Sequence, residues 1–524
     1  MSRKLVLATP SVFFISFVGL SWLFAARWIF CYDEGIYIDG ARRILNGQAP
    51  YRDFFALTGP GTYWFHAAAF RVLGESLASA RIPVILDSAV MLALGFWLTA
   101  RLSHVWLGLL VVAYAAVRWA APYPLFVPNH RFDSSAAAMV ALCAGLAAAD
   151  GQGGRLPKVL CLLSGLAAAW AAWSTPTVGL VIPLMGAWLI WRDRNMRLAA
   201  AFLAGVVTVF LGGWAWLASH HAVTPMLRSL VWTASNYEQA NAFPYGGVIG
   251  GYAGWFRDAS GLELVWRALP ALFLAVPALV PVVAIVGWSV YLWRAKPQEP
   301  LRQEAVLLIL FTAAMVASTY PRMDLDHLAY FLPASAAAAA TVVEKCPAPR
   351  LKAVSFLGLV FVTSLVIWYY APIYLQNVAL QTPVGKIVGR PDAIRMVASV
   401  MERVPERRTL FVYPYAPVFY FLRNGVNPTR YSYLQPGMMT AADEAAVLAD
   451  LTRNPPEFVL EVPIPEEDFL RIWPGTDRAR LRMNRIEHFL QTRYEEVAAA
   501  PRGVLPYRVL RRLGWEHDDA RTPD

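Results

Sequence analysis

Two adjacent carboxylates, Asp33 and Glu34, follow directly after the first apolar run of the chain. At the boundary between lipid and water, a carboxylate can take a proton from a hydroxyl group or bind a metal ion. Asp33 could also cap the helix that follows it, because an acidic side chain there accepts backbone N–H bonds. The pair therefore indicates either acid–base chemistry or a helix cap.

A second charged segment, residues 128–133, reads Pro-Asn-His-Arg-Phe-Asp and leads into another apolar run. Its Arg131 could neutralise a phosphate group, or it could sit among the lipid headgroups. Its Asp133 precedes three small residues and could cap the helix that they begin. Both residues have a functional and a structural interpretation.

A third segment, residues 320–327, reads Tyr-Pro-Arg-Met-Asp-Leu-Asp-His and joins two apolar runs. Arg322 offers a planar, permanently charged fork that suits a phosphate group. His327 could donate a hydrogen bond to a leaving phosphate. The structural alternatives are interfacial anchoring by Arg322 and a helix cap by Asp326.

A divalent metal ion is a further alternative for these segments, because hard cations prefer carboxylate oxygens. The residues that could bind one are Asp133 or His130 together with Asp324, Asp326 and His327. The four cysteines show no metal-binding spacing. The sequence therefore leaves a metal cofactor open, with Asp133 as its first candidate ligand.

Aromatic and amide side chains gather in the segment 219–267, which we expect to be a long outer loop, and they suit stacking and hydrogen bonding to a sugar. Tyr237 is the candidate that we select from it. Trp and Tyr are also the usual residues of the aromatic belt at a membrane surface, so this second interpretation stays open.

The composition of the chain points to a membrane. Of 524 residues, 57% are hydrophobic and 16% are charged, which excludes intrinsic disorder. Four cysteines cannot hold a chain of this length together as a disulfide scaffold. The sequence shows no Walker A loop and no glycine-rich dinucleotide turn, which disfavours an ATP-driven pump.

Eleven apolar runs are long enough to be membrane spans, since a helix needs about 20 apolar residues to cross a bilayer. The runs are approximately 5–26, 82–100, 103–121, 134–150, 157–173, 178–191, 198–218, 268–293, 304–319, 327–343 and 353–371. No small-residue cleavage site closes the first run, so we interpret it as an anchor.

The net charge of +10 reports the orientation of these spans. With the N-terminus inside, the inner segments carry fourteen basic and five acidic residues, which is the positive-inside pattern. The C-terminal tail then lies outside. Because the surplus is confined to the inner loops, it is no argument for a nucleic-acid partner.

The tail from 372 to 524 differs from the rest, with 20 basic and 19 acidic residues, an ordinary charge density for a soluble domain. Apolar runs at 409–413 and 458–462 predict buried strands, and 507–510 predicts a last one. Helical patterns at 440–452 and 478–492 complete the prediction of a small α/β domain.

The first outer loop, residues 31–81, is long and polar. The spacing of its apolar residues predicts an amphipathic helix over 35–46 that lies on the membrane surface, with Gly47 as its C-cap. A second surface helix is expected around residues 63–73. Asp87, inside the second apolar run, is expected to pair with an arginine such as Arg81 or Arg118.

This loop resembles that of the GT-C membrane glycosyltransferases, in particular the protein mannosyltransferases and the aminoarabinose transferases that modify lipid A. Those proteins place an Asp-Glu pair after their first span, in a loop with two surface helices. A Gly-x-x-Pro-Tyr-x-Asp segment follows, and Gly47, Pro50, Tyr51 and Asp53 match it.

The resemblance implies transfer of a sugar from a polyprenyl-phosphate donor to an acceptor hydroxyl, with inversion at the sugar carbon. Asp33 would be the general base, and Glu34 would orient Asp33 or the acceptor. The candidates for the donor phosphate are Arg322, His327, Arg131 and Arg52. The supporting candidates are Asp53, Tyr51, Asp133, Asp324 and Tyr237.

The expected fold is an α-helical polytopic membrane protein with about eleven spans and a C-terminal periplasmic α/β domain. We expect residues 1–371 to form the catalytic membrane domain and 372–524 the periplasmic domain. The expected location is a bacterial inner membrane with the N-terminus in the cytoplasm. The expected partners are a polyprenyl-phosphate-linked sugar, a lipid, glycan or protein acceptor, and membrane lipid.

Two other classes of function remain open from the sequence. A transporter or lipid flippase would place broken helices and charges near the middle of the membrane. Here most polar segments stand at the outer ends of spans, which favours chemistry at the outer face. A non-enzymatic sensor or scaffold is the third class.

Overall fold

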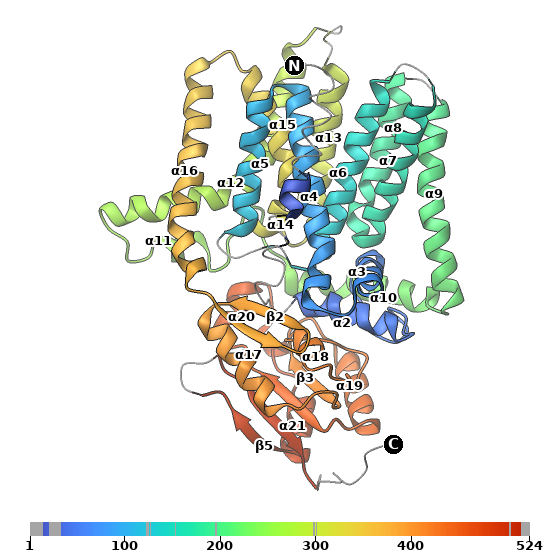
Figure 1. Cartoon of the computed structure of the whole chain (residues 1–524), viewed down its shortest axis with the longest axis vertical. Coiled ribbons are helices and arrows are strands. Elements are labelled where there is room, and N and C mark those ends of the chain that lie inside the picture. The colour runs from blue at the N-terminus through green and yellow to red at the C-terminus, as the bar shows by residue number, and fades with distance from the viewer. Residues whose placement is uncertain are drawn as a thin grey trace.

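The computed structural model describes residues 14–19, 22, 33–121, 125, 127–151, 154–193, 196–296, 299, 301–501 and 505–514. About two thirds of the first predicted span, 5–26, lies outside these residues. The described part of the chain forms a bundle of long helices above a smaller α/β domain (Figure 1).

Helices cover each of the ten later apolar runs. They are α4 (Leu77–Leu102), α5 (Val105–Ala120), α6 (His130–Ala149), α7 (Arg155–Ser174), α8 (Val181–Asp193), α9 (Met196–Ser219), α12 (Leu262–Arg294), α13 (Arg302–Ser318), α15 (Leu332–Lys345) and α16 (Pro349–Leu375). Among the described residues, six helices are long and apolar enough to cross a membrane. The protein is therefore membrane-embedded, and the count of eleven spans stays a prediction.

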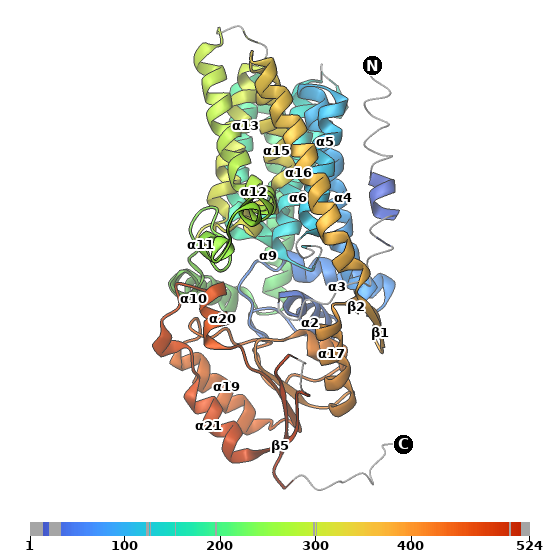
Figure 2. The same cartoon turned by 90° about the vertical axis from the view of Figure 1, so that its left-hand side faces the viewer.

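Three helices lie across the end of the bundle that faces the α/β domain: α2 (Asp33–Leu45), α3 (Gly61–Leu73) and α10 (Val223–Asn241) (Figures 1 and 2). The helices predicted over 35–46 and around 63–73 are confirmed as α2 and α3, and Gly47 follows α2 with a positive φ of 81°. The ten residues from Glu34 to Arg43 are buried by protein, and the location of α2 on the membrane surface stays a prediction.

The α/β domain is built on a four-stranded sheet with the order β3-β4-β6-β5. Its strands are β3 (Leu410–Pro414), β4 (Phe458–Val462), β5 (Tyr494–Ala499) and β6 (Arg508–Arg512). β3 and β4 are parallel, and the other two neighbouring pairs are antiparallel. The three predicted strands are confirmed as β3, β4 and β6, whereas β5 was not predicted.

The helices of the domain are α17 (Pro391–Arg403), α18 (Val418–Leu422), α19 (Ala441–Arg453), α20 (Glu466–Ile472) and α21 (Asn484–Arg493). A hairpin of β1 (Val378–Thr382) and β2 (Gly385–Gly389) follows α16 and precedes them. The helix predicted over 440–452 is confirmed as α19. The one predicted over 478–492 begins later, because a short 3-10 turn (Arg478–Arg480) occupies its start.

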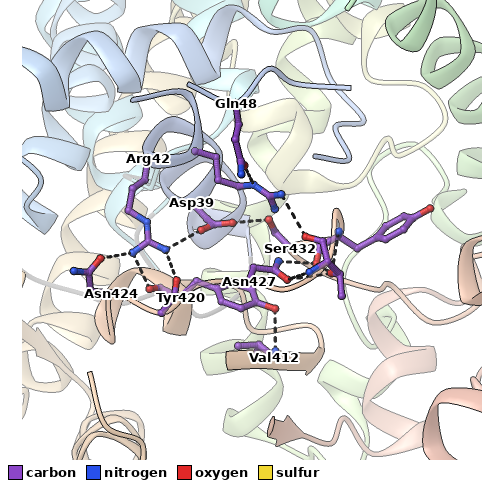
Figure 3. Close-up of polar contacts among 12 residues, drawn as sticks. Asp39, Arg42, Gln48, Val412, Tyr420, Asn424, Asn427 and Ser432 are labelled. Carbon is purple, nitrogen blue, oxygen red and sulfur yellow. Dashed lines mark hydrogen bonds and ion pairs between the residues drawn. The ribbon is translucent and has the colours of Figure 1, made fainter. Parts of the chain in front are cut away.

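A buried polar network holds α2 against the α/β domain (Figure 3). Asp39 forms an ion pair of 3.2 Å with Arg42 and accepts a 2.6 Å hydrogen bond from Ser432. Arg42 also donates to the carbonyl oxygens of Tyr420 and Gly425. The polar face of α2 is therefore buried against partners of the domain rather than exposed to water.

Candidate active site

Asp33 is the first residue of α2, which places its half-buried carboxylate where the membrane helices, α10 and the α/β domain meet. Tyr415, which follows β3, donates a 2.8 Å hydrogen bond to Asp33 Oδ1. Burial raises the pKa of Tyr415 well above its usual value, and the charge of Asp33 raises it further. Tyr415 is therefore a protonated donor at neutral pH.

Other tyrosines surround the same carboxylate. Burial raises the pKa of Tyr37 and Tyr433 well above the usual value, and the charge of Asp33 adds to the effect on both. Tyr237 of α10 interacts with the charges of Asp33, Arg131 and Arg322. Four tyrosines, Tyr37, Tyr237, Tyr415 and Tyr433, thus lie close enough to Asp33 to feel its charge, and Tyr415 is hydrogen-bonded to it.

Glu34 faces away from this group and is fully buried. Its two carboxylate oxygens accept hydrogen bonds from Arg81 Nε at 2.5 Å and Arg81 Nη2 at 2.9 Å. Arg81 belongs to α4, so the ion pair fixes the start of α2 to a membrane helix. Glu34 thereby sets the place of Asp33 through the backbone, and its direct role with the acceptor stays a prediction.

The segment 320–327 forms the cationic side of the site. Arg322 Nε forms a 2.9 Å ion pair with Asp324, and Arg322 Nη2 donates to the Ile472 carbonyl at 3.0 Å. The guanidinium also lies over the rings of Phe243 and Trp473. Its Nη1 is buried and has no hydrogen-bond partner among the described residues.

Asp324 holds two other side chains of this segment, those of Arg322 and His327. Besides Arg322, it accepts a 2.8 Å hydrogen bond from Nδ1 of His327, and it caps the short helix α14 (Leu325–Ala329). Burial alone would raise the pKa of Asp324, but His327 and Arg322 lower it well below its usual range. The structural alternative of Asp326 as the cap is wrong, because Asp324 is the N-cap.

Arg131 reaches the same space from α6. It is buried, donates from Nη1 to the Ser318 carbonyl at 2.8 Å, and interacts with the charge of Asp324. Its Nε has no hydrogen-bond partner in the described part of the chain. Two buried guanidinium groups thus keep an N–H that no described residue accepts, which is the chemistry of an anion site.

Arg52, Tyr51 and Asp53 lie in a separate cluster. Arg52 is bound to Asp53 at 2.6 Å and to the His220 carbonyl. Asp53 accepts the Ala49 N–H, and Tyr51 donates its hydroxyl to the Thr58 carbonyl. These contacts stabilise the turn after α2, and a role of the three side chains with the donor stays a prediction.

Asp133 lies on α6 and interacts with Asp87 of α4, and neither Asp133 oxygen has a well-formed hydrogen bond to a described residue. The expected pairing of Asp87 with an arginine is wrong, because Arg81 binds Glu34 and Arg118 binds Asp326. No group of three or more His, Cys, Asp or Glu residues is arranged for a metal ion in the described ranges. A metal at Asp133 stays a prediction.

Sequence reasoning did not find the residues that the α/β domain contributes, Tyr415, Tyr433 and Trp473. Two Tyr-x-Tyr motifs, residues 413–415 and 431–433, were the available signal. Their importance depends on contacts with residues almost 400 positions earlier in the chain. The hydrogen-bonded pair of Asp33 and Tyr415, for example, is separated by 382 residues.

The bundle, the interfacial helices and the trailing α/β domain together form the fold of the GT-C membrane glycosyltransferases, as the resemblance implied. In particular, the structure is similar to ArnT from Cupriavidus metallidurans bound to undecaprenyl phosphate. The TM-score is 0.54 at 13% sequence identity, over 99% of this chain and 99% of ArnT. The apo state of ArnT gives a TM-score of 0.53 at 13% identity, over 98% and 99% of the two chains.

The archaeal oligosaccharyltransferase AglB from Archaeoglobus fulgidus, in complex with an inhibitory peptide and a dolichol-phosphate, is less similar. Its TM-score is 0.47 at 12% identity, over 96% of this chain and 74% of AglB. No protein-family model matches the sequence, and no curated protein matches it.

Proposed function

We propose that this protein is an inverting glycosyltransferase that moves a sugar from a polyprenyl-phosphate donor to an acceptor hydroxyl. The observation that carries the proposal is that one carboxylate, Asp33, and two buried guanidinium groups, Arg131 and Arg322, all interact with Tyr237. Each guanidinium group keeps an N–H unpartnered by any described residue. Such a site has a base for the incoming hydroxyl and cations for the departing phosphate.

In this mechanism Asp33 removes the proton from the acceptor hydroxyl as its oxygen attacks the sugar carbon. The bond between that carbon and the phosphate oxygen breaks on the opposite face, so the sugar carbon is inverted. The polyprenyl phosphate gains one negative charge as it departs. Arg131 and Arg322 stabilise this developing charge, because they are permanently cationic and held in place before the reaction.

His327 is placed to assist the leaving phosphate. Its Nδ1 is bound to Asp324, which fixes the ring and leaves Nε2 for the substrate. The donor class is supported by the fold shared with ArnT, whose structure holds undecaprenyl phosphate.

We further propose that the site lies at the outer face of a bacterial inner membrane. The apolar helices next to the site would accommodate the lipid tail of the donor, and residues 372–524 would form a periplasmic domain over it. The acceptor would be a lipid, glycan or protein that arrives from the periplasm. A divalent metal near Asp133 remains part of the proposal without a step assigned to it.

The test is Asp33→Asn in membranes supplied with labelled undecaprenyl-phosphate sugars, a panel of mannose, glucose and 4-amino-4-deoxyarabinose. Transfer to endogenous acceptors should fall by roughly 10²–10⁴-fold, because a positioned base contributes about that factor. The amount of protein in the membrane should not change.

Asp392→Asn is the matched control, since Asp392 is also an acid in the first turn of a helix but pairs with the exposed Arg390. It should transfer at the wild-type rate. Wild-type transfer by Asp33→Asn would contradict the assignment of the base. Movement of the lipid across the membrane without any transfer would instead support a flippase.

A further inference from the structure

We infer that the α/β domain is a working part of the catalytic centre, and that Tyr415 is a positioning residue that acts through Asp33. This inference rests on the proposed function and deepens it, because it assigns the domain a role in the chemistry. It is carried by contacts that join two regions of the chain about 380 residues apart.

Tyr415 contacts the proposed base directly. Tyr415 donates its hydroxyl to Asp33 Oδ1 at 2.8 Å and is buried, with 4% of its surface exposed. A carboxylate at the start of a helix can rotate, and a fixed donor on one oxygen restricts that rotation. The hydrogen bond thus leaves the other oxygen, Oδ2, as the one that would accept the proton in the proposed reaction.

Tyr415 itself is fixed by packing within the α/β domain. Its ring makes edge contacts with Tyr433 at 5.1 Å and with Trp473 at 6.0 Å between centroids. Both neighbours belong to the α/β domain. Tyr415 therefore has little freedom to adapt, and its hydroxyl is a preorganised donor rather than a mobile one.

The same domain also holds the cationic side of the site. The Ile472 carbonyl accepts from Arg322 Nη2 at 3.0 Å, and the Trp473 ring lies 5.9 Å from the Arg322 guanidinium. Adjacent residues at the end of α20 thus orient the arginine that we assign to the phosphate. The α/β domain therefore contacts both Asp33 and the arginine that we assign to the phosphate.

The α/β domain is also firmly attached to α2. Glycine at position 35 allows a very close approach, since a Cβ there would lie 2.0 Å from the Val418 nitrogen. The buried Asp39, Arg42 and Ser432 network lies one turn further along α2 (Figure 3). The relative position of Asp33 and Tyr415 is therefore set by a large interface.

The test is Tyr415→Phe in the full-length protein, assayed with the undecaprenyl-phosphate sugar that the wild type uses. We expect kcat to fall about 10- to 100-fold, the range for loss of a hydrogen bond to a charged group. KM for the donor should stay the same. The acid limb of the pH–rate profile should move to higher pH, because the lost donor stabilised the ionised carboxylate.

Tyr494→Phe is the matched control, because it also removes a buried hydroxyl of the domain, one that donates to the Pro456 carbonyl. It should leave kcat and the pH profile unchanged. In an Asp33→Asn background, Tyr415→Phe should have no further effect on the residual rate, whereas a general structural defect would lower it again.

A second variant keeps the inference testable if Tyr415→Phe does not fold. Incorporation of 3-fluorotyrosine at position 415 keeps the ring and the hydroxyl but makes the hydroxyl a stronger donor, so the acid limb should move to lower pH. An unchanged acid limb in both variants would overturn the inference. An inactive Asp33→Asn with a normal Tyr415→Phe would refute this inference alone, whereas an active Asp33→Asn would refute the proposed base.

Discussion

At the scale of single residues, Asp324 illustrates how the site keeps its charges in place. Its carboxylate accepts from Arg322, from His327 and from two backbone N–H groups. Because these partners lower its pKa well below the usual range, Asp324 is ionised at every pH at which the enzyme would work. One buried anion thus keeps the side chains of Arg322 and His327 oriented.

His66 of α3 gives a prediction for the pH dependence of stability. Burial, with a smaller contribution from the charge of Arg81, lowers the pKa of His66 to about 3. In the unfolded chain the pKa is about 6.5, so the unfolded state binds more protons between these values, and stability decreases as the pH falls through this window. At pH 5 the loss from this group is about 2 kcal/mol.

The measurement is thermal unfolding of the purified protein at pH 7.5 and pH 5, compared with a His66→Gln variant. The variant should lose less of its melting temperature between the two pH values than the wild type does. Equal losses in both proteins would show that His66 takes up a proton in the folded state without penalty.

The sequence predicted those site residues that differ in chemical type from the residues around them. Asp33 and Arg322 are charged residues at the ends of apolar runs, so their positions alone suggested a site. Tyr415 and Trp473 are aromatic residues in a domain rich in aromatics, and nothing local distinguishes them. Their place beside Asp33 is a long-range contact, which periodicity and spacing do not encode.

At the scale of elements, α2 is the part of the molecule that sequence patterns describe least completely. The pattern predicted its helix correctly, since apolar residues such as Ile36 and Ile44 recur at helical spacing. The pattern failed on the surroundings, because Asp39 and Arg42 look the same whether they face water or a polar protein surface. In the structure they face the α/β domain.

The segment 219–267 shows the opposite case. It was expected to be a loop because it is polar and lies between two spans, but α10 occupies 19 of its residues. The helix carries Tyr237 to the site, where burial raises its pKa and the charges of Arg322 and Arg131 lower it in part. A helix that runs along the junction can be amphipathic without being long and apolar.

Gly35→Ala tests the interface between α2 and the α/β domain. The added Cβ would lie 2.0 Å from the Val418 nitrogen, so the backbones must move apart, and overpacking of this kind typically costs about 1–3 kcal/mol. We expect transfer activity to fall at least about tenfold, because Tyr415 then moves away from Asp33. Limited proteolysis should release the domain faster than in the wild type.

Gly212→Ala serves as the comparison, because Gly212 lies in α9 and a Cβ there would meet nothing within 4 Å. It should match the wild type in both assays. A Gly35→Ala protein with normal activity and normal protease resistance would mean that the interface can separate without effect on the site.

At the scale of the whole molecule, the two ends of the bundle have different chemistry. Far from the α/β domain, Arg101 binds Asp150 at 2.8 Å and Arg192 binds Glu304 at 2.9 Å. Longer ion pairs also join Arg101 to Glu304 and Arg192 to Asp150. This network ties together the ends of α4, α6, α8 and α13 on the side that the sequence assigns to the cytoplasm.

Cys346, which follows α15, allows a test of this orientation. It is a free, partly exposed thiol, whereas Cys143 and Cys161 are buried. In a Cys31→Ser background, a membrane-impermeant maleimide should label Cys346 only after the inner membrane has been opened. Labelling in sealed spheroplasts would place this end of the bundle outside and reverse the predicted orientation.

A reporter on the other side completes the test. Glu402 is exposed near the end of α17, so a Glu402→Cys variant in a Cys346→Ser chain should react in sealed spheroplasts. The fold-level prediction of a helical membrane part followed by an α/β domain is confirmed, because composition separates the two parts strongly. The side on which each end lies rests on the charge pattern and on this experiment.

The long separation between Asp33 and Tyr415 also has a consequence for the biogenesis of the protein. α2 is synthesised early, but the groups that bind Asp39, Arg42 and Asp33 are made about 380 residues later. Until then, the polar face of α2 lacks its partners, and the base is not yet positioned. If Asp33 is the base that we propose, the site would become competent only after the α/β domain has folded and docked against α2, so a chain truncated before this domain should show no transfer.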